Sequence, residues 1–118
     1  MNNAAKSVFI FGLYLVALSL IVMVTPNTLL GLLGLPPTSE VWIRVIGVLV
    51  LFLGFYFTQA ARKGLTDFFR WTVYVRSSLI LFLLAFVLLG FAGPSLILLG
   101  AVDLLGAIWT GWALRQNA

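Results

Sequence analysis

Long apolar runs dominate the hydrophobic pattern of this 118-residue chain, and polar residues collect in the short segments between them. Each run approaches the roughly 20 residues that a helix needs to cross the hydrocarbon core of a bilayer. Turn-forming residues, chiefly glycine and proline, separate the runs. The pattern therefore predicts four membrane-spanning helices, at Ser7–Val24, Glu40–Arg62, Arg70–Gly90 and Pro94–Leu114.

The segment between the first two predicted spans has a helical pattern of its own. Pro26 suits the first position of a helix, leucines share one face of the next two turns, and Gly34 is typical of a helix C-terminus. We expect Pro26–Leu33 to form a short helix in the membrane interface. The remaining connections are short turns, so the second and third spans should be antiparallel neighbours. The predicted fold is all-α: an up-down-up-down four-helix bundle in a single transmembrane domain over residues 1–118.

The composition favours a membrane location. Hydrophobic residues make up 63% of the chain and charged residues only 8%, whereas a soluble domain typically contains about 25% charged residues. So few charges cannot cover the surface of a water-soluble globule of this size. The net charge of +4 is typical of the basic flanks of membrane spans. We therefore expect the lipid bilayer, and no nucleic acid, as the partner of this surface.

The basic residues are unevenly divided between the two ends of the predicted spans. Arg44 alone lies near one end, and five basic residues lie at the other: Lys6, Arg62, Lys63, Arg70 and Arg115. The positive-inside rule then places both termini and the middle turn in the cytoplasm. We expect a multi-pass protein with cytoplasmic N- and C-termini.

The side-chain inventory restricts the chemistry. The chain contains no cysteine and no histidine, which excludes disulfides, thiol chemistry and imidazole ligation of a haem or metal by this chain. The acids Glu40, Asp67 and Asp103 are too far apart in sequence to suggest a metal-ligand cluster. There is no nucleotide-binding loop, catalytic triad or paired-carboxylate motif. We expect a protein that is not an enzyme and that carries no cofactor.

Asp103 and Arg76 are charged residues inside predicted spans that lack a partner one helical turn away. A charge at this depth is costly and usually pairs or takes part in function. With a rise of about 1.5 Å per residue, their backbones differ in depth by roughly 9 Å. Two interpretations stay open. One is a buried ion pair that fixes helix register, with Arg44 completing its hydrogen bonds; the other is a ligand, ion or proton site between the helices.

Small and polar residues share one face on the second and fourth spans, which indicates close helix contacts. On the second span, Gly47 and Gly54 share a face with Arg44. A pocket between the helices would be lined by polar residues of these and neighbouring spans: Tyr14, Tyr56, Thr58 and Thr110. Anchoring at the membrane interface explains the two tyrosines equally well.

Four short motifs carry a family resemblance. They are Trp42-x-Arg44-x-x-Gly47, Val75-Arg76, Val102-Asp103-x-x-Gly106-Ala107 and Trp109-Thr110. In a four-span chain of this size they resemble the BphX-like family, small bacterial membrane proteins of unknown function found near aromatic-degradation genes. The resemblance implies a location in the bacterial inner (plasma) membrane. It supplies no activity and no residue roles.

Two functions from different classes are compatible with these observations. The leading hypothesis is an accessory or assembly subunit of a larger membrane complex, or a binder of a lipid or small apolar ligand. The alternative is a transporter or channel formed by homo-oligomerisation, with Asp103 and Arg76 on the permeation path.

Overall fold

The computed structural model describes residues 1–116 and is all-helical over that range. Its elements are α1 (Asn3–Val24), α2 (Pro26–Leu32), α3 (Trp42–Lys63), α4 (Thr66–Leu88), the 3-10 helix η1 (Pro94–Leu96) and α5 (Ile97–Gln116). Four helices are long and apolar enough to cross a membrane: α1, α3, α4 and the continuous η1–α5 segment. The predicted all-α fold class, with four long apolar helices and a short helix between the first two, is thereby confirmed. Residues 117 and 118 of the expected domain lie outside the described range.

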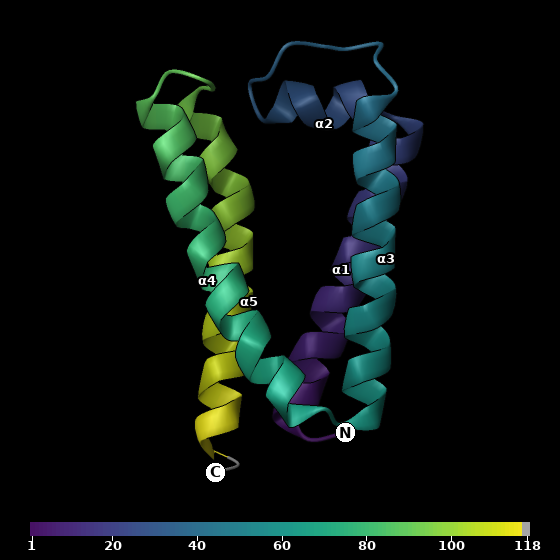
Figure 1. Cartoon of the computed structure of the whole chain (residues 1–118), viewed down its shortest axis with the longest axis vertical. Coiled ribbons are helices and arrows are strands. Elements are labelled where there is room, and N and C mark those ends of the chain that lie inside the picture. The colour runs from purple at the N-terminus through teal and green to yellow at the C-terminus, as the bar shows by residue number, and fades with distance from the viewer. Residues whose placement is uncertain (117–118) are drawn as a thin grey trace.

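The four long helices form two antiparallel pairs (Figure 1). α1 packs along α3, and α4 packs along α5. The pairs meet at the end that carries both chain termini, where α1 also contacts α5, and they diverge toward the opposite end. We call these ends the terminus end and the α2 end, because α2 lies across the opening between the pairs (Figure 1). The bundle is therefore splayed rather than uniformly packed.

α3 and α4 follow one another through a tight turn but pack against different helices. Gly64 ends α3 in the left-handed conformation, with φ of 67°, which glycine adopts without steric cost. Beyond this turn α3 and α4 make few contacts. The expectation that the second and third spans pack side by side is therefore wrong. The cause is that the glycine face of α3 is already occupied by α1.

Glycines allow the helices of each pair to approach closely. A Cβ atom on Gly54 of α3 would lie 2.8 Å from Cγ2 of Val16 in α1. A Cβ atom on Gly100 of α5 would lie 2.8 Å from Cα of Ile80 in α4. Because lipid provides no hydrophobic attraction between helices, such close van der Waals packing is what holds membrane helices together. The small-residue face predicted on the second span is thus a helix contact.

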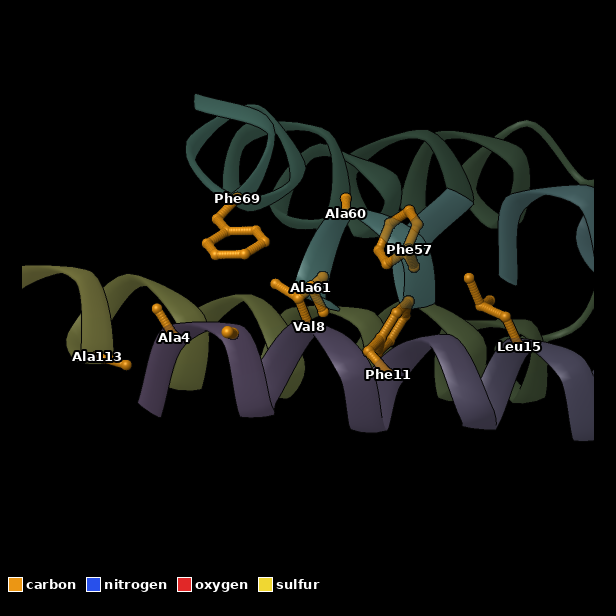
Figure 2. Close-up of a cluster of buried hydrophobic side chains, with 10 residues drawn as sticks. Ala4, Val8, Phe11, Leu15, Phe57, Ala60, Ala61, Phe69 and Ala113 are labelled. Atoms are coloured by element: carbon orange, nitrogen blue, oxygen red, sulfur yellow. The ribbon is translucent and has the colours of Figure 1, made fainter. Parts of the chain in front are cut away.

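The apolar core lies near the terminus end and draws on all four long helices (Figure 2). Phe11 of α1 and Phe57 of α3 are both buried, with ring centroids 5.6 Å apart. Phe69 of α4 is 1% exposed, and Ala113 contributes from α5. This cluster fastens the two pairs together and borders the buried polar residues described below.

The segment around α2 connects the two pairs at the opposite end. Leu30 and Leu33 are buried, so one face of this segment packs against the rest of the protein. Gly34 has φ of 70°, and a Cβ atom there would lie 3.6 Å from Oγ of Ser95 at the start of the last span. The chain after α2 therefore reaches from the α1–α3 pair to the α4–α5 pair.

Candidate functional site

Arg76 of α4 is buried where α1, α4 and α5 meet, with 2% of its surface exposed. Its Nη2 atom donates to Oγ1 of Thr110 at 2.8 Å and to Oγ1 of Thr72 at 3.2 Å. Its Nε atom donates to the backbone carbonyl of Thr72 at 3.3 Å. The guanidinium carbon lies 4.6 Å from the centre of the Phe11 ring, which is a cation–π distance. Arg76 therefore joins all three helices.

Thr110 extends this contact into a directed chain of hydrogen bonds. Its Oγ1 atom lies 2.7 Å from Oγ of Ser7, and Ser7 donates to the backbone carbonyl of Ala4 at 2.7 Å. A hydroxyl has only one proton to give, so Thr110 is the donor to Ser7 and the acceptor from Arg76. The chain thus runs from Arg76 through Thr110 and Ser7 to the first turn of α1.

One nitrogen of the buried guanidinium remains without a partner. Nη1 of Arg76 is buried and makes no hydrogen bond within the described residues. It faces Gly106 of α5, where a Cβ atom would lie 3.0 Å from it. A buried donor without an acceptor is costly, so this nitrogen is the atom of the cluster best placed to receive a further group.

Asp103 lies one turn of α5 from Gly106 and is half-buried. Gly106 is the residue that Nη1 of Arg76 faces, but no direct ion pair forms between Asp103 and Arg76. Within residues 1–116 the ion pair observed is Asp67 with Arg70, at 3.3 Å. The structure therefore brings the two charges that the sequence singles out into one region, with threonine hydroxyls rather than the carboxylate on the guanidinium.

Arg44 lies apart from this cluster. It is exposed on α3, and its Nη1 atom donates to the backbone carbonyl of Met23 in α1. A cation at this place complements the negative C-terminal end of α1, whose own last turn has no basic residue. The expectation that Arg44 approaches Asp103 is therefore wrong. The depth of Arg44 along its span does not reveal that its face meets α1 rather than α5.

The four residues expected to line one pocket lie in separate places. Thr110 belongs to the buried network around Arg76. Tyr14 is half-buried beside Phe11, with ring centroids 5.3 Å apart. Tyr56 lines a small apolar pocket between α3 and α4, and Thr58 lines a larger groove between α1 and α3.

This larger groove, which we call the α1–α3 groove, has a volume of about 650 Å³. Ligand pockets typically measure roughly 300–1,000 Å³ and combine an apolar lining with a few polar groups. Both features are present here. The lining residues are Phe9, Leu13 and Val16 of α1 and Leu51, Phe52, Phe55, Thr58, Gln59 and Arg62 of α3.

Sequence reasoning missed the groove as a unit, although one signal was present. On α3 the positions Leu51, Phe55, Thr58 and Arg62 recur at helical spacing and change from apolar to polar toward the terminus end. That gradient marks one face of one helix. The second wall, on α1, follows only from the pairing of the helices.

The four spans, the buried arginine network and the outward-facing groove define a small multi-pass integral membrane protein. Comparison with protein-family models, with curated proteins and with solved structures finds no match to this chain.

Proposed function

We propose that this protein is a non-enzymatic component of a bacterial inner membrane that binds a lipid or small apolar ligand in the α1–α3 groove. The observation that carries the proposal is the groove itself, about 650 Å³ in volume and walled by aliphatic and aromatic side chains. The resemblance to BphX-like proteins favours the bacterial location, and the basic residues at the terminus end favour cytoplasmic termini.

The walls of the groove suit an acyl chain or another apolar group. Phe52 and Phe55 are more than half exposed, and Leu13 faces them across the groove with half of its surface exposed. Such side chains present area to a ligand without a prior rearrangement of the core. The groove opens on the outside of the bundle, so a ligand can enter laterally from the bilayer.

A groove-filling substitution tests this function. We expect Leu13→Trp to place a large side chain in the groove and to reduce the amount of lipid retained by the detergent-purified protein. Leu20→Trp is the matched control, because Leu20 lies on the same helix with 52% exposure, against 50% for Leu13, and does not line the groove. Native mass spectrometry of the wild type and both variants counts the retained lipids. Equal retention in all three would refute binding in the groove.

An accessory or assembly subunit would use the same groove for a helix of a larger complex. Purification from the native membrane distinguishes this case. A stoichiometric membrane protein that copurifies with the wild type and with Leu20→Trp, but not with Leu13→Trp, would favour the subunit function. Copurification of lipid, without a stoichiometric protein, would favour the ligand-binding function.

A second candidate function, transport by an oligomer, is supported by the unpaired Nη1 atom of Arg76 and the nearby Asp103. Polar groups buried within spans often mark permeation paths. In proteoliposomes that enclose a pH-sensitive dye, this candidate predicts a proton flux that Asp103→Asn abolishes. Asp67→Asn, which alters the exposed pair with Arg70, should leave the flux intact. The absence of any flux above that of empty liposomes would reject proton transport.

A further inference from the structure

The polar end of the α1–α3 groove is basic, and no acid in the described part of the chain pairs with it. Arg62 lies in the last turn of α3, and its side chain makes no ion pair within residues 1–116. Lys6 lies three residues before the groove residue Phe9, on the adjacent part of α1. Asp67, the acid that follows the α3–α4 turn, is paired with Arg70. An anionic group placed at Arg62 would therefore meet positive charge that no carboxylate of residues 1–116 neutralises.

The groove also has the length of one bilayer leaflet. Its α3 wall extends from Leu51, near the middle of the helix, to Arg62 at its end. With a rise of about 1.5 Å per residue, that wall is roughly 16 Å long, close to half of a hydrocarbon core of about 30 Å. Apolar residues occupy the part near mid-membrane, and Thr58, Gln59 and Arg62 occupy the part near the interface. This order matches a lipid that lies parallel to the helix.

We infer that the α1–α3 groove selects an acidic phospholipid, with an acyl chain along the apolar wall and the headgroup phosphate at Arg62. The inference rests on the proposed lipid-binding function and names its ligand class. A guanidinium recognises phosphate oxygens through two parallel N–H donors. Gln59, one turn before Arg62 and half-buried, adds an amide at the level of the ester groups. The net negative charge of the lipid complements the positive charge of Arg62 at this end of the groove.

Paired lipids and paired variants test this inference. Native mass spectrometry is used to measure binding of phosphatidylglycerol and of phosphatidylcholine with identical acyl chains to the detergent-purified protein. Arg62→Gln removes the charge that lines the groove. Lys63→Gln is the matched control, since it removes an equal charge from the adjacent exposed residue that does not line the groove. Leu13→Trp blocks the apolar wall.

We expect the wild type to prefer phosphatidylglycerol. Arg62→Gln should weaken phosphatidylglycerol binding roughly fivefold, as expected for the loss of one basic residue in direct contact with an anionic headgroup, and leave phosphatidylcholine binding unchanged. Lys63→Gln should match the wild type, and Leu13→Trp should weaken binding of both lipids. An equal loss in Arg62→Gln and Lys63→Gln would overturn the inference, because it would reveal general surface charge in place of a headgroup site.

The remaining outcomes separate this inference from the function on which it rests. If Leu13→Trp weakens both lipids equally and Arg62→Gln changes neither, the groove binds lipid without selecting acidic headgroups, and only this inference fails. If Leu13→Trp changes nothing, the proposed function fails as well. Displacement of the bound phospholipid by palmitate, but not by excess phosphatidylglycerol, would identify a fatty acid as the occupant and overturn the choice of a phospholipid.

Discussion

At the residue scale, the burial of the Arg76 side chain, with 2% of its surface exposed, has a large energetic cost. An arginine inside a membrane span is tolerated when hydrogen bonds and aromatic contacts replace its hydration. Thr72, Thr110 and Phe11 supply those contacts. The sequence identifies Arg76 and Asp103 because both lack a partner on their own helix. It names Thr110 only as a possible pocket residue and does not identify either threonine as a partner of Arg76. A threonine in a span usually bonds to its own backbone, and a helical position does not specify which way a long side chain extends.

Thr110 is predicted to stabilise the junction of the helices through its hydroxyl. Thr110→Val keeps the shape but removes the acceptor for Arg76 and the donor to Ser7, which should cost about 1–3 kcal/mol, toward the lower end in a membrane. Thr110→Ser keeps the hydroxyl and should lose less. Thermal unfolding in detergent, followed by circular dichroism, measures the difference. Equal Tm values for the two variants would argue against this network.

The partner of Arg76 can be identified by double-mutant cycles. Arg76 contacts Thr110 directly and Asp103 only at a distance, so we predict a larger coupling energy for Arg76→Met with Thr110→Val than for Arg76→Met with Asp103→Leu. The sequence alone predicts a direct pair of Arg76 with Asp103. In that case the Arg76→Met/Asp103→Leu double variant would be more stable than either single variant. The free energies of unfolding of the single and double variants in both cycles distinguish the two predictions. A dominant Arg76–Asp103 coupling would mean that the ion pair forms directly in the membrane.

At the element scale, the pattern of apolar runs predicts which segments are helical but not which helices pair. Every predicted span overlaps its helix, because length and hydrophobicity decide membrane insertion locally. The glycine face of the second span was also predictable, since small residues mark contact surfaces in lipid. The helix that packs against this face was not predictable. A face on Trp42–Lys63 fits α1, α4 or α5 equally well in sequence, and only the packing of Gly54 against Val16 resolves the choice.

Gly54 is predicted to be sensitive to a single added methyl group. Gly54→Ala would place its Cβ atom 2.8 Å from Val16 and 3.0 Å from the carbonyl oxygen of Gly12, and overpacking of this kind typically costs about 1–3 kcal/mol. Gly111→Ala is the control, because its Cβ atom would come no closer than 3.7 Å to Val73. Melting temperatures in detergent should fall for Gly54→Ala and hold or rise for Gly111→Ala. A larger fall in melting temperature for Gly111→Ala than for Gly54→Ala would contradict close packing of α1 against α3 at Gly54.

At the scale of the whole molecule, two helix pairs are joined at the terminus end and bridged at the other by the segment around α2 (Figure 1). The splay between the pairs was not predictable, since short loops are compatible with a uniform bundle as well as with this arrangement. The groove was likewise hidden, because its two walls come from helices that are separated in sequence by α2 and its loop.

The membrane topology is predicted by the distribution of basic residues. Five basic residues lie near the terminus end of the spans and Arg44 near the other, so both termini should be cytoplasmic. Reporter fusions that are active on only one side of the membrane, placed after the last residue and within Leu35–Ser39, should report opposite sides. The same side for both fusions would contradict the four-span arrangement.

A structure determined in lipid nanodiscs, with lipids carried over from the native membrane, tests the central claim most directly. We predict an elongated density in the α1–α3 groove, with its apolar part between Leu13 and Phe55 and its headgroup at Arg62. Side chains or a second protein helix filling that space, with no lipid density along it, would contradict the claim that this protein binds a membrane lipid there.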